Sequence, residues 1–237
     1  MSAVGKLFLL PTPLGENAPM EVIPIYNTEI IRGLRIFVVE QLRTARRFLR
    51  KIDPQFPIDE AIFVELNEHT IENFDYNAVI QYLLKGNDVG LLSEAGLPCV
   101  ADPGNAMVAL AHEKNIEVCP LVGPSSLMLA LMASGMNGQN FVFHGYLPRE
   151  KDKLKEKIVA MENISIKYHQ TQIFIEAPYR NVQLFDLLLN TCRPDTLLCI
   201  ATNISLETQT IKTLSVSQWK KYKNIDIHKK PTVFILG

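Results

Sequence analysis

The sequence predicts an α/β protein built from two α/β domains. In the first half of the chain, short apolar runs alternate with segments whose apolar residues recur at helical spacing, a pattern typical of a parallel sheet with helices. In the second half, several short predicted strands follow one another without a helix between them, which indicates antiparallel pairing. We place the boundary near Gly123, with a parallel domain over residues 1–122 and a mixed domain over residues 123–237.

The strands predicted in the first domain are apolar runs that end at Gly, Pro or a polar residue. They cover residues 7–10, 35–39, 61–66, 89–92 and 116–121. The helices predicted between them cover residues 25–32, 41–52, 75–85 and 105–113. Asp75 is the expected N-cap of the third of these helices, and Gly86 is its expected stop.

The second domain is expected to open with a helix that begins at Gly123-Pro124-Ser125-Ser126 and ends at Gly135. This helix is apolar nearly all round, which predicts that it is buried. The strands that follow are predicted at residues 141–146, 172–176, 197–202, 208–214 and 232–236. Two further helices are predicted, one starting within residues 149–157 and one over residues 182–190.

Composition and charge exclude several classes of protein. The net charge of −1 provides no overall field that would draw the chain onto nucleic acid or a membrane, so any RNA contact must come from local patches. The four cysteines form no C-x-x-C pair and are expected to be reduced thiols. The longest apolar helix candidate, residues 127–133, is too short to span a bilayer, and no signal peptide is recognisable. We therefore expect a cytoplasmic protein.

Polar loops follow most of the strands of the predicted sheet. The longest is Ser93 to Gly104, which is punctuated by glycine and proline. The polar segments at strand ends are residues 11–15, 40, 67–70, 93–98 (the first part of that loop) and 176–180. Because an open α/β sheet binds ligands at the carboxyl ends of its strands, these loops predict a cleft at one rim. Within the long loop, Asp102 precedes Pro-Gly and fits a structural turn.

The helix predicted at 41–52 carries cations along one face. They are Arg43, Arg46, Arg47, Arg50 and Lys51. Spacings of three and four residues place the arginines on one stripe. The stripe is either a phosphate-binding face or a solvated helix surface.

Several familiar catalytic patterns are missing from the sequence. It contains no Walker-type phosphate loop, no G-x-G-x-x-G after the first strand and no G-x-S-x-G. The five histidines are scattered, and we expect no metal site. The pattern alone therefore predicts an α/β enzyme with a cleft and does not identify its reaction.

A series of short motifs runs in order along most of the chain. They are Thr12-Pro13-Leu14-Gly15-Glu16, Val39-Glu40-Gln41-Leu42-Arg43, Leu66-Asn67-Glu68, Ser93 to Gly104, Val122-Gly123-Pro124-Ser125-Ser126, Gly145-Tyr146-Leu147-Pro148 and Glu176-Ala177-Pro178-Tyr179-Arg180. Together these motifs resemble the tetrapyrrole (corrin/porphyrin) methylase superfamily, and within it most closely the small-subunit ribosomal RNA cytidine-2′-O-methyltransferase family.

The resemblance implies a homodimer of two-domain α/β subunits with a cofactor cleft between the domains. It implies S-adenosylmethionine as cofactor and a ribose in small-subunit ribosomal RNA as the methylated group. The cofactor contacts carried over by position are Pro11, Ser93, Glu94, Ala95, Ser125, Ser126, Asn203, Ile204 and Thr232. The partner implied is ribosomal RNA or the small ribosomal subunit, with neither a membrane nor a metal.

A ribose 2′-hydroxyl is a poor nucleophile until its proton leaves, so the proposed reaction needs a base or a charged group nearby. The candidates for catalysis are Glu40, Glu68 and Arg43. The candidates for holding RNA phosphate are Arg46, Arg47, Arg50 and Arg180. The alternative for Glu40 is an ion pair with the arginine-rich helix that follows it.

The chain also departs from the family pattern. Where the family has A-R-E-L-T-K, this chain has Ala201-Thr202-Asn203-Ile204-Ser205-Leu206 and loses three charges. It ends on the strand predicted at 232–236, without the C-terminal extension that the resemblance leads us to expect. Two alternatives to a ribosomal RNA methyltransferase therefore stay open. One is a methyltransferase acting on a tetrapyrrole precursor or another small molecule, and the other is a non-catalytic relative that binds cofactor or RNA.

Overall fold

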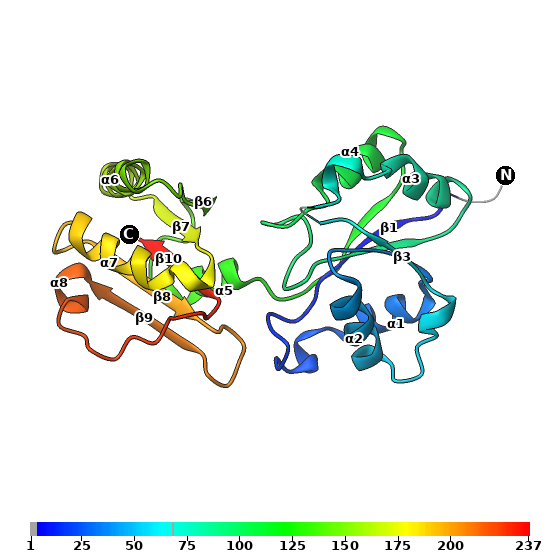
Figure 1. The fold of residues 1–237 in the computed structure, drawn as a ribbon, viewed down its shortest axis with the longest axis horizontal. Coiled ribbons are helices and arrows are strands. Elements are labelled where there is room, and N and C mark those ends of the chain that lie inside the picture. Colours follow the sequence, from blue (N-terminus) through cyan, green and yellow to red (C-terminus); the bar gives the residue numbers. More distant parts are fainter. Residues whose placement is uncertain (1–3, 68) are drawn as a thin grey trace. The chain divides into compact units, whose positions relative to one another are not determined.

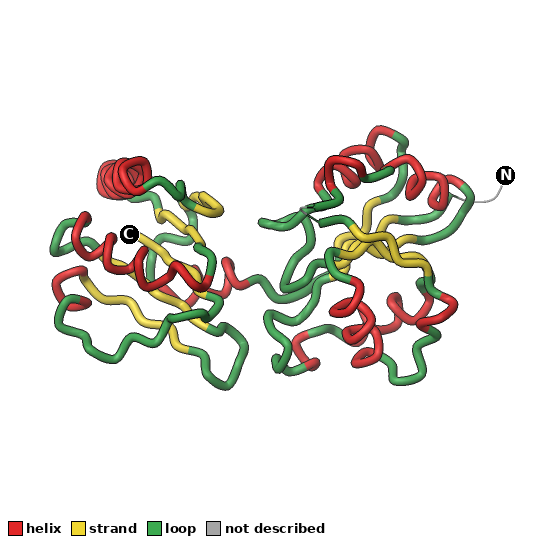
Figure 2. The backbone as a smooth tube through the Cα atoms, viewed as in Figure 1, coloured by secondary structure: helices red, strands yellow, loops and turns green. Residues whose placement is uncertain are grey.

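The computed structural model describes residues 4–67 and 69–237 of the chain. The chain divides into two compact units, Met1–Ser125 and Ser126–Gly237 (Figure 1). Each unit contains one five-stranded sheet with helices packed against it (Figure 2). The predicted α/β fold class is therefore confirmed.

The first unit alternates strands and helices. Its strands are β1 (Leu7–Leu10), β2 (Ile36–Val39), β3 (Ile62–Glu65), β4 (Val89–Leu92) and β5 (Val118–Pro120). Its α-helices are α1 (Ile25–Gly33), α2 (Leu42–Ile52), α3 (Tyr76–Leu84) and α4 (Asn105–Glu113). Three short 3-10 helices lie at Met20–Val22, Ile58–Glu60 and Ile71–Asn73. Asp75 caps α3 as predicted, because its carboxylate accepts a hydrogen bond from the backbone N–H of Ala78 at 3.0 Å.

All strand pairs of the first sheet are parallel, and the strand order is β3-β2-β4-β1-β5. Alternate residues of each strand face opposite sides, so the sheet contributes to two cores. Phe37 and Val39 of β2 pack with α1 and α2, whereas Ile36 and Val38 pack with α3 and α4. Figure 1 shows the same division, with α1 and α2 on one face and α3 and α4 on the other.

This strand order creates a switch point at the centre of the sheet. The neighbours β2 and β4 are hydrogen-bonded in parallel. The chain leaves β2 for α2 on one face and leaves β4 for α4 on the other. Because the two loops diverge, the carboxyl ends of β2 and β4 form a topological switch point, which is where α/β sheets bind ligands. Glu40 and Glu94 follow their strands at this point.

The second unit is mixed, as the adjacent strands in the sequence predicted. Its strands are β6 (Phe141–Tyr146), β7 (Thr171–Ile175), β8 (Leu197–Thr202), β9 (Thr210–Ser215) and β10 (Thr232–Leu236). Its helices are α5 (Ser126–Ser134), α6 (Lys151–Tyr168), α7 (Asn181–Thr191), α8 (Val216–Trp219) and a 3-10 turn at Pro178–Arg180. The strand order is β6-β7-β10-β8-β9, in which only the β6–β7 pair is parallel.

Helices α6, α7 and α8 cover one face of the second sheet. Leu154 and Ile158 of α6 and Leu184 of α7 belong to a core with Phe174 and Phe234 of the strands. Trp219 of α8 completes that core, and its indole N–H donates to the carbonyl of Leu198 at 2.7 Å. The core thus fixes α6 beside α7.

The prediction that the helix after Ser126 is fully buried is wrong. Leu127, Ala130 and Leu131 of α5 are buried, but Met132 is 79% exposed. An all-apolar helix shows no stripe from which the buried side can be read, so the sequence did not reveal that one side of α5 lies outside the core of its own unit.

Across the residues that the structure describes, no helix is long and apolar enough to cross a membrane.

Candidate functional site

A network of buried hydrogen bonds connects the loops that follow β1 and β4. The backbone N–H of Thr12 donates to the carbonyl of Gly96 at 2.9 Å, and the N–H of Gly96 donates to the carbonyl of Thr12 at 3.1 Å. The Ser93 hydroxyl donates to the Gly96 carbonyl at 2.6 Å and lies 3.2 Å from the Thr12 hydroxyl. Since Thr12 and Ser93 are both buried, these bonds hold the two loops in one arrangement.

The segment after β5 packs against the same loops. A Cβ atom added to Gly123 would lie 2.2 Å from the Cβ of Pro11, so only glycine allows this approach. The carbonyl of Val122 accepts a hydrogen bond from the Asn27 side chain at 2.8 Å, which ties the segment to α1. The ends of β4, β1 and β5 thus form one rigid rim.

The loop from Ser93 to Gly104 contains four residues with positive φ. Gly96 and Gly104 adopt this conformation at φ 86° and 128°, and a Cβ on Gly104 would also lie 2.7 Å from the Leu91 side chain. Cys99 and Ala101 adopt it at φ 65° and 58°, although they are not glycines. Such residues cost about 1 kcal/mol or more each and are common at functional sites. The strained backbone immediately precedes Asp102.

Three carboxyl groups interact where β2 and β4 end. Asp102 is hydrogen-bonded to Glu40, and both Glu40 and Glu94 repel its negative charge. Burial, followed by the hydrogen bond and this repulsion, raises the pKa of Asp102 to about 8. Burial and the charge of Glu40 also raise the pKa of Glu94. At neutral pH Asp102 is therefore the protonated partner that donates to Glu40.

The expectation that Asp102 has only a structural role in a turn is therefore incomplete. Asp102 does lie in a turn, but its carboxyl group belongs to the same cluster as Glu40. Sequence reasoning missed this because the contact depends on β2 and β4 being neighbours, which no local pattern shows. Thr12 was missed for the same reason.

Glu40 makes no ion pair with the arginines of α2 within the described ranges 4–67 and 69–237. Most cations of that helix have other partners. Arg47 pairs with Glu16, Lys51 donates to the Glu16 carbonyl at 2.5 Å, Arg50 donates to the Pro54 carbonyl at 2.6 Å and Arg46 lies 5.4 Å from the centroid of the Phe63 ring. Arg43, at the start of α2, has no such partner among the described residues. A phosphate-binding role for Arg46, Arg47 and Arg50 stays a prediction.

In the second unit, three of the residues expected to contact cofactor lie together. Thr232 of β10 is paired with Thr202 of β8, and their hydroxyls lie 3.2 Å apart. Asn203 follows directly, with positive φ of 51°, and its side-chain amide donates to Thr208 at 2.9 Å. Asn203, Ile204 and Thr232 are all buried.

The expected cofactor contacts are divided between the two units. Pro11, Ser93, Glu94, Ala95 and Ser125 lie in the first unit, and Ser126, Asn203, Ile204 and Thr232 lie in the second. Arg180 also lies in the second unit, on the turn before α7. Glu68, the other candidate base, lies outside the described residues. Their roles stay predictions.

The chemistry of the carboxylate cluster suits a ligand that carries positive charge. The negative charges of Glu40 and Glu94 raise the pKa of Asp102, and an approaching cation relieves this repulsion. Among the described residues, no group of three or more His, Cys, Asp or Glu side chains is arranged to hold a metal ion. An organic cation such as a sulfonium or an ammonium group relieves the same repulsion.

The sequence matches known proteins across most of its length. The family model "Tetrapyrrole (Corrin/Porphyrin) Methylases" matches residues 23–219. The chain is 31% identical over 179 residues to "Ribosomal RNA small subunit methyltransferase I" of Bacillus subtilis, and 33% identical over 180 residues to the protein of that name from Micromonospora olivasterospora. Each match covers 76% of this chain but only 57% and 53% of the respective relative, so the chain spans little more than half the length of these proteins.

The fold is similar to that of a solved methyltransferase. The crystal structure of uroporphyrin-III-C-methyltransferase from Thermus thermophilus aligns with a TM-score of 0.56 and covers 98% of this chain and 92% of that chain. Sequence identity is 15%, so this likeness concerns the fold alone.

The protonated state of Asp102 predicts an unusual dependence of stability on pH. Its folded pKa of about 8 lies above the ordinary value of 3.8, so the folded state binds this proton more tightly than the unfolded state. The stabilisation is complete below about pH 4 and is lost as the pH rises through about 8. Asp102→Asn resembles the protonated acid and cannot lose that proton. Between pH 6 and 8.5, we expect the free energy of unfolding of the wild type to fall by at least about 1 kcal/mol more than that of the variant, as measured by urea unfolding. Parallel pH profiles of the two proteins would contradict this assignment.

The contact between Gly123 and Pro11 predicts a second effect on stability. Gly123→Ala places a methyl group where the proline ring lies, and neither segment can move without disturbing the rim. We expect a loss of about 1–3 kcal/mol in the free energy of unfolding. Gly33→Ala is the control, because nothing lies within 4 Å of a Cβ at that position. If both variants unfold like the wild type, the rim is not closely packed.

Proposed function

Because the chain belongs to the tetrapyrrole (corrin/porphyrin) methylases, we propose that it is an S-adenosylmethionine-dependent methyltransferase that methylates a ribose 2′-hydroxyl in small-subunit ribosomal RNA. The observation that carries the reaction class is the group of interacting carboxyl side chains where β2 and β4 end, in a chain that matches this family over residues 23–219. The names of the relatives at 31% and 33% identity support the RNA substrate.

The residues of the first unit fit a cationic cofactor. When bound, S-adenosylmethionine supplies a methyl group activated by a sulfonium. The carboxyl groups of Glu40 and Glu94 provide negative charge for that cation, and Asp102 would lose its proton when the cation approaches. The loop at Ser93 to Ala95 is held rigid by the bonds to Thr12 and Gly96, which favours binding without a large cost in chain entropy.

We assign further cofactor contacts from the resemblance. In the first unit they are Pro11 and Ser125. In the second unit they are Ser126, Asn203, Ile204 and Thr232. The same resemblance leads us to propose a homodimer that acts in the cytoplasm.

Glu40 is the proposed general base. As the ribose oxygen forms its bond to the methyl carbon and the carbon–sulfur bond breaks, the hydroxyl proton would pass to a carboxylate of this kind. Asp102 would act as a positioning residue, because its hydrogen bond fixes the orientation of the Glu40 carboxylate. Arg43 begins the helix after Glu40 and lacks a partner among the described residues, so its guanidinium is available for RNA phosphate.

A second candidate function is methylation of a tetrapyrrole precursor or another small molecule. One observation favours it. The segment from Ala201 to Leu206 lacks the charges of the family motif. A non-catalytic relative that binds cofactor or RNA is the third candidate, and it predicts no methyl transfer to any substrate.

The proposal predicts methyl transfer from tritiated S-adenosylmethionine to small ribosomal subunits that lack the modification. Glu40→Gln should lower the rate about 100- to 10,000-fold, because a positioned general base contributes a factor of this size. Glu60→Gln, an exposed glutamate at the 3-10 helix before β3, is the control and should keep full activity. Binding of the cofactor without transfer to the subunits, but with transfer to a tetrapyrrole precursor, would favour the second candidate.

A further inference from the structure

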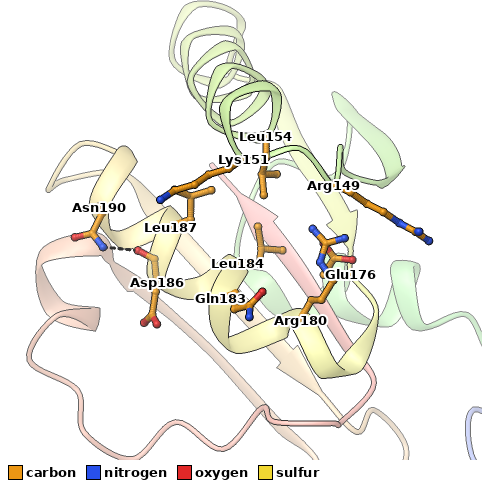
Figure 3. Close-up of a pocket in the computed structure, with 10 residues that line it drawn as sticks. All are labelled: Arg149, Lys151, Leu154, Glu176, Arg180, Gln183, Leu184, Asp186, Leu187 and Asn190. Atoms are coloured by element: carbon orange, nitrogen blue, oxygen red, sulfur yellow. Dashed lines mark hydrogen bonds and ion pairs between the residues drawn. The ribbon is translucent and has the colours of Figure 1, made fainter.

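The second unit contains a cavity of about 450 Å³ between the start of α6, the end of β7 and α7 (Figure 3). None of the residues assigned above to the cofactor lines it. Its size falls in the range of small-molecule and nucleotide sites. The cavity therefore offers a second binding surface on this chain.

The floor of the cavity is apolar. It is formed by Leu154 of α6 and by Leu184 and Leu187 of α7, whose side chains point toward one another in Figure 3. Leu154 and Leu184 belong to the core of the unit, so the floor is fixed by packing. Leu154 and Leu184 are buried, so the apolar surface that a nucleobase would contact comes mainly from Leu187, which is partly exposed.

The rim of the cavity is cationic. Arg149 and Lys151 lie at the start of α6 and are exposed, and neither has a hydrogen bond, ion pair or ring contact within the described part of the chain. The N-cap residue of α6, Glu150, makes no side-chain cap, and its carboxylate pairs with Lys153 at 2.7 Å. The first N–H groups of an 18-residue helix therefore add to the positive charge of this rim.

One wall of the cavity combines a buried acid with an arginine. The Glu176 side chain is 3% exposed, and its Oε2 atom lies 3.3 Å from Nη2 of Arg180, which is 17% exposed. Oε2 of Glu176 makes no hydrogen bond among the described residues, and Arg180 keeps further N–H donors beyond this single ion pair. Asp186 also lines the cavity, but its carboxylate points away from the three leucines (Figure 3).

We propose that this cavity binds one nucleotide of a single-stranded RNA segment, with a phosphate at Lys151 and the base against the leucine floor. The charge and the apolar floor both fit a nucleoside phosphate, in which an anion lies next to a flat ring. A base paired within a duplex could not reach the leucine floor, so the segment must be unpaired. Arg180 and the amide of Gln183 are placed to hydrogen-bond the base edge or the sugar. This inference rests on the proposed function, because it assigns part of the RNA substrate to the second unit.

The test is the binding of a short fluorescein-labelled single-stranded oligoribonucleotide of mixed sequence to the full chain, followed by fluorescence anisotropy at several salt concentrations. Lys151→Ala should weaken binding about five- to tenfold and reduce the slope of log affinity against log salt by about 0.7, the value for one phosphate contact on a single strand. Lys155→Ala is the matched control, because Lys155 is an exposed lysine one turn further along α6 that does not line the cavity. It should change neither quantity.

A second pair of variants tests the cavity independently of its charge. Gln183→Trp fills the space beside the floor and should weaken RNA binding at least about fivefold, whereas Val182→Trp on the neighbouring exposed position should not. Both variants should unfold at the temperature of the wild type, because residues 182 and 183 are exposed. Wild-type affinity in both Lys151→Ala and Gln183→Trp would overturn the proposal.

Two further outcomes distinguish RNA binding in this cavity from the binding of a free nucleotide and from a failure of the proposed function. Cytidine 5′-monophosphate and unlabelled RNA can each be tested for displacement of the labelled oligoribonucleotide. If both displace it at the same concentration, the cavity is a site for a free nucleotide and the RNA assignment is wrong. If the wild-type chain methylates small subunits but the cavity variants bind RNA as tightly as the wild type, only this inference is refuted. A wild-type chain that neither methylates subunits nor binds RNA refutes the proposed function with it.

Discussion

The hydrogen bonds among Thr12, Ser93 and Gly96 are the constraint on which the candidate site depends. They join the loops after β1 and β4, and the close approach of Gly123 to Pro11 adds the segment after β5 to the same rim. With these loops fixed, the backbone from Ser93 to Gly104 is held in one conformation, in which Cys99 and Ala101 are left-handed. That conformation brings Asp102 to Glu40. The buried network thus stabilises a strained loop that would otherwise relax.

The electrostatic character of the candidate site follows from this geometry. A parallel sheet with β2 beside β4 brings the loops after the two strands together, and these loops carry Glu40, directly after β2, and Glu94, the second residue after β4. Asp102 is held against them with a raised pKa, so the folded protein keeps a proton that it would lose in water. Carboxyl groups held in this way destabilise the free protein at high pH and favour a cation at the same place. The cost in stability is of the kind that functional sites commonly carry.

The sequence predicted the elements well and the contacts between them poorly. Apolar runs located every strand of the first sheet, and the Asp75 cap was predictable because it involves neighbours along the chain. The strand order was not predictable, since it depends on which crossovers pack best. Because β2 and β4 were not known to be neighbours, the contact between Asp102 and Glu40 was missed. The five cations of α2 looked alike in sequence, yet the structure separates Arg43, without a partner among the described residues, from Arg46, Arg47 and Arg50, which have partners. Arg180 was recognised from a motif, but the cavity around it depends on the packing of α6 beside α7.

In the proposed function, the carboxyl groups of Glu40, Glu94 and Asp102 form the charged part of a site for a cationic cofactor. The most direct measurement is calorimetric titration of the wild-type chain with S-adenosylmethionine at neutral pH in two buffers of different ionisation enthalpy. A cation that approaches Asp102 lowers its pKa, so we predict binding with a net release of protons. Binding of S-adenosylhomocysteine, whose sulfur is uncharged, should release fewer protons from the protein. Binding with no difference between the two buffers, or no binding at all, would contradict the account.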